Sequence, residues 1–182
     1  EDVIFRVEEG ENIRVISKKL KYSNIIDNYT TLRVGLKLFA KKLPLRAGEY
    51  LFPANMKPKN VVEILQTGKT FFRSITIAEG LSTFQIIKLL EDTEGLTGNI
   101  IGYPREGSLL PETYFFSYGD SRQKILSRMQ DKMKALLSQL WLKRQVGLPF
   151  KSPEEALILA SIVEKETGLT IERPHIASVF IN

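Results

Sequence analysis

Cysteine is absent from this 182-residue chain, and histidine occurs once, at His175. Without cysteine, disulfides, thiolate catalysis and cysteine-ligated zinc are excluded. A single histidine excludes a histidine-rich metal site and leaves only one candidate base for a Ser-His triad. We therefore expect no metal and no other cofactor, and we expect carboxylates to carry any catalysis.

Long apolar runs are also missing. Unbroken stretches such as Ala156–Ala160 are far shorter than the roughly 20 residues that span a bilayer. The chain starts with a glutamate rather than a methionine and ends inside an apolar-periodic run at Asn182, so we interpret it as a segment of a longer protein. We expect the segment itself to be soluble, which says nothing about an anchor elsewhere in a parent protein.

The composition is typical of a globular protein. Hydrophobic residues make up 43% of the chain and charged residues 26%, which excludes disordered and fibrous classes. The formal net charge is +5, and basic side chains line one face of a helix predicted over residues 120–145. A solvated face and an anionic partner are both compatible with that pattern. Because acidic residues are spread along the chain and no glycine-rich phosphate loop occurs, we expect no nucleic-acid partner.

The first part of the chain alternates short strands and helices. Alternation predicts a strand at Val3–Val7, and Asn12 is placed to cap a helix through Leu20. Four further elements follow in our prediction: a short helix over Asn24–Tyr29, a helix after Thr30 that buries Leu32, Leu36 and Phe39, a strand at Ala47–Phe52, and a helix over Val61–Gln66 capped by Asn60 and closed by Gly68.

The second part is mostly helical and suggests a boundary near residue 70. We predict a strand at Phe71–Ile77, a helix from Ser82 to about Glu91, a loop over Thr93–Gly107, the long helix at 120–145, and a helix that starts at Ser152. The fold class is therefore α+β, with a small αβ subdomain followed by a mostly helical domain.

A strand, Glu-Gly turn and helix unit occurs twice. Glu9–Gly10 recurs as Glu79–Gly80, and the helix positions Ile16, Lys18 and Leu20 recur as Ile86, Lys88 and Leu90. Internal duplication explains this pattern, and so does chance recurrence of a common strand-turn-helix arrangement.

The helix after Ser152 has the clearest start in the chain. Ser152, Pro153 and Glu155 form a capping-box pattern, and Ala156–Val163 is apolar nearly all round, which predicts a buried helix. Glu164 continues the stripe of Leu157, Ala160 and Ser161, whereas Glu166 lies on the opposite side. A poorly solvated glutamate at the negative end of a helix dipole favours its protonated form, as a general acid requires. The alternative is a hydrated helix end with no catalytic role.

The consecutive aromatic residues Tyr114, Phe115 and Phe116 are compatible with stacking on a sugar or base and with core packing. His175 follows a proline near the start of the last segment, where we expect it to be exposed.

The residues around Glu164 carry a resemblance to a known family. The run Leu159–Thr167, then Glu172–Arg173 and Ala177–Asn182, resembles the signature of the YceG-like family of endolytic murein transglycosylases, also called MltG. Supporting matches are Glu106–Gly107, Pro111–Tyr114 and Leu45–Phe52. These matches span essentially the whole chain.

The resemblance implies a LysM-like subdomain at residues 1–70 and a truncated YceG-like catalytic domain at residues 71–182. It assigns catalysis to Glu164. Substrate contacts would come from Glu166, Ser161, Glu106, Glu112, Thr113 and Tyr114. The implied partners are peptidoglycan glycan strands and the peptidoglycan synthesis machinery. The implied location is the inner membrane, through an N-terminal anchor absent from this segment, with the catalytic domain facing the periplasm.

The implied reaction is lytic cleavage of the β-1,4 bond between N-acetylmuramic acid and N-acetylglucosamine, with one glutamate acting first as acid and then as base. A non-catalytic peptidoglycan-binding module is the alternative. Family members continue for about another hundred residues past Asn182, by analogy of fold. We therefore expect this segment to have little or no activity by itself.

Overall fold

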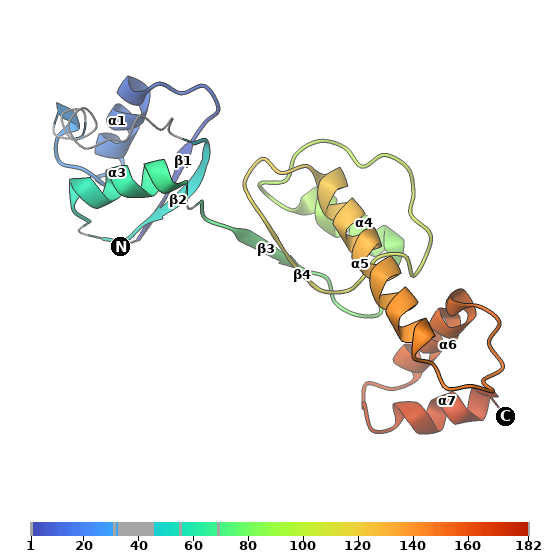
Figure 1. Cartoon of the computed structure of the whole chain (residues 1–182). Helices are drawn as coiled ribbons and strands as arrows, with labels where there is room; N and C mark the ends of the chain where they lie inside the picture. Colours follow the sequence, from blue (N-terminus) through green and yellow to red (C-terminus); the bar gives the residue numbers. More distant parts are fainter. Residues whose placement is uncertain (1, 31, 33–45, 55, 69, 182) are drawn as a thin grey trace. The chain divides into compact units, whose positions relative to one another are not determined.

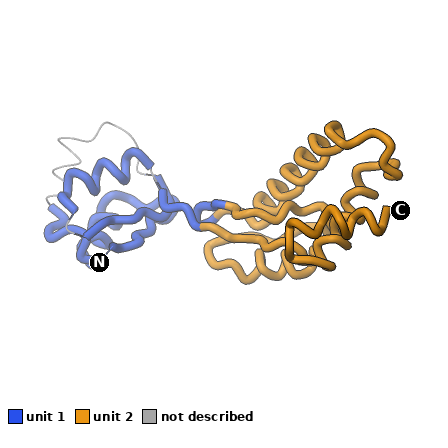
Figure 2. Tube along the Cα trace, turned by 90° about the horizontal axis from the view of Figure 1, so that it is seen from below, with its two compact units in different colours: residues 1–73, 115–119 blue, residues 74–114, 120–182 orange. Residues whose placement is uncertain are grey.

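The computed structural model describes residues 2–30, 32, 46–54, 56–68 and 70–181 (Figure 1). The chain divides into two compact units, Glu1–Arg73 with Phe115–Gly119 and Ser74–Tyr114 with Asp120–Asn182 (Figure 2). Helices are combined with small sheets, which confirms the α+β class. Within the described ranges, no helix has both the length and the apolar character to cross a bilayer.

The first unit is a two-stranded sheet packed with helices. Strand β1 (Val3–Val7) pairs antiparallel with β2 (Gly48–Phe52), and Phe5 lies opposite Tyr50. Helices α1 (Ile13–Tyr22) and α3 (Pro58–Thr67) share one core with the inward-facing residues of both strands. This core contains Phe5, Val7, Ile16, Leu20, Ile26, Leu32, Tyr50, Phe52, Val61, Val62 and Leu65.

Local capping signals explain where these helices begin and end. The prediction for Asn12 is confirmed, because its side-chain oxygen accepts hydrogen bonds from the amides of Arg14 and Val15 at 3.0 and 3.2 Å. The cap predicted at Asn60 is wrong. Helix α3 begins earlier, since Pro58 suits the first helical position, and Lys57 occupies the cap position. Its predicted end is confirmed, with Gly68 in a left-handed conformation at φ +64°.

The predicted helix over Asn24–Tyr29 is wrong. Asn24 has φ +53°, which ends helical geometry just after α1. Helical backbone resumes at Tyr29, Thr30 and Leu32, where the Asn28 side chain accepts a hydrogen bond from the Thr30 amide. The remainder of the helix predicted after Thr30, with Leu36 and Phe39, lies outside the described residues, as does Leu45.

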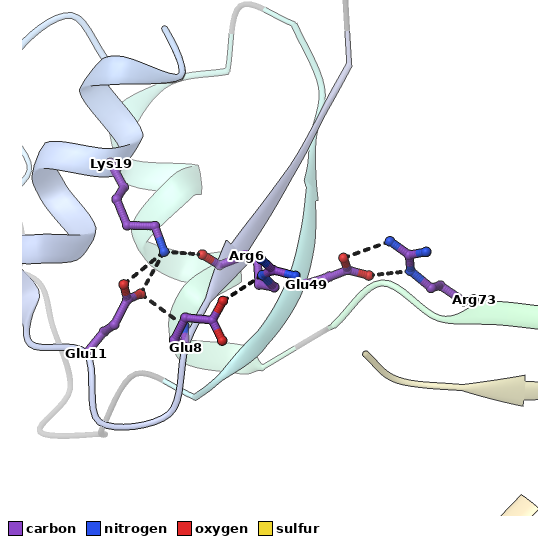
Figure 3. Close-up of polar contacts among 6 residues, drawn as sticks. All are labelled: Arg6, Glu8, Glu11, Lys19, Glu49 and Arg73. Carbon is purple, nitrogen blue, oxygen red and sulfur yellow. Dashed lines mark hydrogen bonds and ion pairs between the residues drawn. The ribbon is translucent and has the colours of Figure 1, made fainter. Parts of the chain in front are cut away.

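A buried ion pair joins β2 to the start of β3 (Arg73–Thr76). Glu49 is only 4% exposed, and its two carboxylate oxygens accept from Arg73 Nε and Nη2 at 2.8 and 3.0 Å (Figure 3). A second cluster on the same unit has Lys19 Nζ donating to both Glu11 oxygens and to the Arg6 carbonyl (Figure 3). Such bidentate and charge-assisted contacts are among the stronger hydrogen bonds in proteins.

The remaining elements follow in chain order. Strand β3 neighbours β4 (Thr113–Phe116), and α4 (Thr83–Asp92) follows β3. Ser82 caps α4 in a complete capping box with Gln85. Helix α5 (Arg122–Leu142) begins with an arginine that donates to the carbonyls of Leu90, Glu91 and Gly98, so Arg122 is not part of a purely solvated face. Helices α6 (Pro153–Glu166) and α7 (Arg173–Ile181) complete the order.

The long helix α5 is buried along only part of its length. Ile125, Leu126 and Met129 are buried. Farther along the helix, Leu136 and Leu140 are exposed. The apolar residues of α5 are therefore covered by other elements only near its start.

The twofold strand-turn-helix pattern is present in the structure and extends further than predicted. Gly10 and Gly80 both have left-handed φ values, +80° and +75°, and Ile16, Leu20, Ile86 and Leu90 are all buried. Each strand-turn-helix pattern is followed by a strand that buries a tyrosine and the phenylalanine two positions later, Tyr50 with Phe52 and Tyr114 with Phe116. The Tyr50 and Tyr114 hydroxyls each donate to the carbonyl four residues earlier, at 2.5 and 2.8 Å. The next helices bury Val61, Val62 and Leu65 and, at the matching spacing, Ile125, Leu126 and Met129.

Candidate active site

The start of α6 is fixed by its cap. Ser152 Oγ accepts a hydrogen bond from the Glu155 amide at 3.3 Å, as predicted. The Glu155 carboxylate accepts from the Lys151 amide instead of the Ser152 amide, so only half of the predicted capping box forms. One backbone donor of the first turn, the Glu155 amide, is nonetheless satisfied by the cap, which fixes where α6 begins.

The predicted burial of α6 is wrong within the part of the chain that the structure describes. Val163 is its one buried residue among those described, while Ile158 is 61% exposed and Ile162 is 38% exposed. Apolar residues all round a helix predict burial only if neighbouring elements cover each face. Here α5 and α7 contact α6, and much of its apolar surface stays open.

Glu164 lies in the last turn of α6 and pairs with an arginine at the start of α7. Glu164 Oε2 is 2.9 Å from Arg173 Nη2, and the glutamate side chain is 30% exposed. The nitrogen Nε of Arg173 is buried and has no hydrogen-bond partner among the described residues. The carboxylate is therefore held by a cation and remains accessible from solvent.

Two further contacts hold the chain on either side of Glu164. Thr167 is buried and donates through Oγ1 to Glu172 Oε2 at 2.7 Å, which closes the turn between α6 and α7. Lys165 Nζ donates to the Gly80 carbonyl at 2.8 Å, which ties the end of α6 to the turn between β3 and α4. The residues next to Glu164 thus make specific contacts and are not merely a hydrated helix end.

The other two site residues predicted on α6 are exposed. Ser161 Oγ donates to the Ile158 carbonyl at 2.7 Å, within its own helix. Glu166 is exposed at the last position of the helix. Both lie within one turn of Glu164, Ser161 on the same stripe of the helix and Glu166 on the opposite side. Their binding of substrate stays a prediction.

Glu106 and Glu112 have other partners. Both Glu106 oxygens accept from the Thr83 amide, at 3.2 and 2.9 Å, which places a negative charge at the start of α4 where the helix dipole favours it. The Glu112 carboxylate forms an ion pair with Lys132 of α5. These contacts join loops and helices of the second unit, and a substrate contact by either glutamate stays a prediction.

Thr113 and Tyr114 lie on β4. Thr113 Oγ1 is 2.9 Å from Thr76 Oγ1 of β3. Tyr114 is fully buried, and its hydroxyl donates to the Leu110 carbonyl. Burial raises the pKa of Tyr114 to about 12, the charge of Glu112 adding to the shift and that of Arg128 opposing it. Of the two uses left open for these aromatic residues, the structure has Tyr114 and Phe116 buried and Phe115 exposed.

An apolar hollow of about 310 Å³ lies on the far side of α6 from Glu164. Its lining comes from α6, α7 and the segment before α6: Pro149, Phe150, Glu155, Ile158, Leu159, Ile162, Phe180 and Ile181. It contains none of the predicted site residues. The open apolar surface and the candidate catalytic carboxylate are therefore separate features of the same helix.

Sequence reasoning gave no role to Lys165, Thr167, Glu172 or Arg173. All four lie in the run that carries the family resemblance, and this was the one signal for them in the sequence. Their partners could not be predicted, because the Thr167–Glu172 and Glu164–Arg173 contacts depend on how the chain turns between α6 and α7. The Lys165 contact joins residues that are 85 positions apart.

Comparison with known proteins identifies relatives over the whole chain. The model of the YceG-like family matches residues 5–182. An endolytic murein transglycosylase of Bacillus subtilis is 24% identical, over 99% of this chain and 58% of that protein. A UDP-N-acetylenolpyruvoylglucosamine reductase of Francisella tularensis is 29% identical, over 90% of this chain and 62% of that protein.

The chain thus spans about three fifths of the length of these two curated relatives. It is also similar to a crystal structure of a Listeria monocytogenes protein described as yceG-like, with 25% identity and a TM-score of 0.45, covering 99% of this chain and 69% of that one. The family match includes β2 and part of β1 as well as Glu164 and Arg173. The chain belongs to the YceG-like family.

Proposed function

We propose that this chain is part of an endolytic murein transglycosylase in which Glu164 performs the proton transfers. The observation that carries the proposal is Glu164 itself, an accessible carboxylate at the end of α6 with Arg173 against it, in a chain of the YceG-like family. The name of the Bacillus subtilis relative supports the same reaction class. The proposed substrate is the glycan strand of peptidoglycan.

Lytic cleavage needs one group that gives and then takes a proton. Protonated Glu164 donates its proton to the glycosidic oxygen as the bond to the muramic anomeric carbon breaks. The resulting carboxylate accepts the proton of the muramic C6 hydroxyl, whose oxygen bonds to the anomeric carbon. The products are a 1,6-anhydromuramyl end and a free hydroxyl on the leaving sugar. Water takes no part, so the second carboxylate used by most glycoside hydrolases is not needed.

Arg173 has a defined place in this scheme. Its guanidinium pairs with the carboxylate of Glu164, and the second proton transfer requires that carboxylate. The first transfer requires the protonated form, so the ion pair has to open before the bond is cleaved. Glu166 and Ser161, one turn or less from Glu164, are the proposed nearest contacts for the sugars.

The remaining assignments are proposals on the same basis. Residues 1–70 would form a LysM-like subdomain that binds glycan, and residues 71–182 would belong to the catalytic domain. Action on peptidoglycan implies an extracytoplasmic location, at the inner membrane through an anchor outside this segment. Association with the peptidoglycan synthesis machinery would place the enzyme at nascent strands. Because Glu164 is 30% exposed and most of α6 is uncovered, we expect the 182-residue chain alone to release few anhydro ends.

The test compares two glutamates of the same helical turn. Murein is digested with the full-length natural protein, with its Glu164→Gln variant and with its Glu166→Gln variant, and the ends are identified by mass spectrometry. We expect Glu164→Gln to lower anhydro-end release by at least about 100-fold, and Glu166→Gln to lower it much less. Unchanged release by Glu164→Gln, at an unchanged melting temperature, contradicts the proposal. Reducing ends would show hydrolysis instead of lytic cleavage.

Two alternatives predict different outcomes. A non-catalytic peptidoglycan-binding module would bind murein and yield neither kind of end. The name of the Francisella tularensis relative suggests a reductase. The sequence has no glycine-rich dinucleotide loop of the Rossmann type, and the family match covers residues 5–182. Consumption of a reduced nicotinamide nucleotide with UDP-N-acetylenolpyruvoylglucosamine would favour the reductase.

A further inference from the structure

The turn before α1 and the turn before α4 are built alike. Each contains a Glu-Gly pair, and each glycine is left-handed, with φ +80° at Gly10 and φ +75° at Gly80. Two residues after each glycine, a polar side chain caps the helix that follows, Asn12 in one case and Ser82 in the other. The two turns therefore serve as an internal comparison.

The surroundings of the two glycines differ. Lys165 Nζ donates to the carbonyl of Gly80 at 2.8 Å, and a Cβ added to Gly80 would lie 3.4 Å from the same nitrogen. A Cβ added to Gly10 would meet no described atom within 4 Å. The lysine beside the first turn, Lys19, donates to the Arg6 carbonyl and to the Glu11 carboxylate instead of to the glycine carbonyl. Because the first turn adopts the same backbone with this different contact, the bond from Lys165 to Gly80 is not a requirement of the turn itself.

The contact matters instead for the end of α6. Packing alone holds this helix weakly, because Val163 is its one buried residue among those described. Successive residues of a helix point about 100° apart, so fixing the Lys165 side chain fixes the direction in which Glu164 projects. From the other side, Arg173 lies 2.9 Å from Glu164. Two polar contacts thus orient the Glu164 carboxylate. The Lys165–Gly80 contact acts through the backbone of the last turn of α6, and Arg173 contacts the carboxylate directly.

The second turn is also a rigid point of attachment. Ser82 and Gln85 form a complete capping box immediately after it, and both oxygens of Glu106 accept from the amide of Thr83. The strand before it supports the turn as well, because the Ile77 amide donates to the Glu112 carbonyl at 3.1 Å. A lysine bound to this turn is therefore bound to a backbone that is itself held in place.

We propose that Lys165 is a positioning residue for Glu164, and that it acts by binding the Gly80 carbonyl. This inference rests on the proposed function, in which Glu164 transfers protons. Lys165 touches no reacting atom in this scheme. It sets the rotation of the last turn of α6, so that the carboxyl of Glu164 meets the glycosidic oxygen in a productive direction.

The test uses the full-length natural protein with Lys165→Met, Lys165→Arg and a matched control, Lys88→Met. Lys88 is an exposed lysine on α4, the helix that follows the Gly80 turn. Misplacing a catalytic group by about 1 Å costs on the order of 100-fold in rate, so we expect Lys165→Met to lower kcat by about 10- to 100-fold. KM should change little, Lys165→Arg should recover much of the loss, and Lys88→Met should behave as the unmodified protein.

Amide hydrogen exchange of the same proteins provides a readout that does not depend on activity. Lys165→Met should speed exchange at the amides of residues 165–167, while Lys88→Met should not. An unchanged kcat in Lys165→Met, in a protein that Glu164→Gln inactivates, overturns the positioning role and leaves the proposed function intact. Full activity of Glu164→Gln overturns the proposed function together with this inference. Equal losses of kcat in Lys165→Met and Lys88→Met also overturn the inference.

Discussion

Arg173 Nη2 lies 2.9 Å from Glu164 Oε2, so the first residue of α7 neutralises the carboxylate in the last turn of α6. The pair links two helices across a short turn that the Thr167–Glu172 hydrogen bond also closes. A guanidinium in this position keeps the candidate catalytic group in one orientation before any substrate arrives.

Replacing Arg173 tests the structural contribution of this pair. Both side chains are about a third exposed, so we expect Arg173→Gln to lower the free energy of unfolding by only about 0.5–1 kcal/mol. The loss should shrink at high salt, because screening weakens the pair in the unmodified protein. Urea denaturation at low and high salt measures both effects. Lys124→Gln, which removes the looser pair with Asp120 at 3.5 Å, is the control and should cost less.

The buried pair of Glu49 with Arg73 should contribute far more to the free energy of unfolding than the Glu164–Arg173 pair. Glu49 is 4% exposed, and its replacement by glutamine removes the negative charge that pairs with the partly buried Arg73. We expect Glu49→Gln to lower the free energy of unfolding by roughly 2–3 kcal/mol. The matched change is Glu8→Gln, since Glu8 pairs with Arg6 at the surface and should cost less than about 1 kcal/mol. Equal effects in a denaturant titration would contradict the importance of burial.

We expect the protein to lose stability at high pH, because Tyr114 is buried with its proton on. Its pKa is raised to about 12, mainly by burial, so the folded state binds the phenolic proton more tightly than the unfolded state. The stabilisation is complete below the unfolded pKa of about 10 and is lost as the pH rises from there through about 12. In Tyr114→Phe this part of the pH dependence should disappear. The variant should also lose about 0.5–1.5 kcal/mol at neutral pH, because the Leu110 carbonyl loses its donor. Thermal unfolding between pH 8 and pH 11 measures the difference.

At low pH we expect Glu11 to make the free energy of unfolding fall as the pH falls. Burial alone would raise its pKa, but the hydrogen bond from Lys19, the Glu8 amide and the nearby charges of Lys19 and Arg6 together lower it. A lowered pKa contributes stability above the unfolded value of about 4, and that stability is lost as the pH falls through the folded value. Acid titration of unfolding should therefore show a shallower loss for Glu11→Gln than for the unmodified chain. Identical titrations would contradict the Lys19–Glu11 contact.

Much of the local structure could be predicted from single residues. Asn12, Ser82 and Ser152 mark three helix starts, and Gly68 marks the end of α3, because each forms its contacts within a few positions of itself. The failures have local causes too. Asn60 is a good capping residue, but Pro58 two positions earlier starts the helix first, and Asn24 adopts a left-handed conformation that ends helical geometry.

The site was predicted in part. The position of Glu164 at a helix end, with Ser161 and Glu166 within a turn, follows from helical periodicity. The partners of the other predicted residues did not follow from any pattern. Glu106 accepts from the amide of Thr83, Glu112 pairs with Lys132, and Tyr114 is buried, because segments distant in sequence pack against them.

The sequence by itself determined the α+β class, several helix caps and a strand-turn-helix pattern that occurs twice, since composition, caps and periodicity act over a few residues. Only the tertiary structure decided which charges meet Glu164, that Lys165 reaches the Gly80 carbonyl, and that α6 keeps much of its apolar surface open. Apolar character and charge are properties of a residue alone. Burial and pairing depend on which other elements pack against that residue, and this is settled when the chain folds.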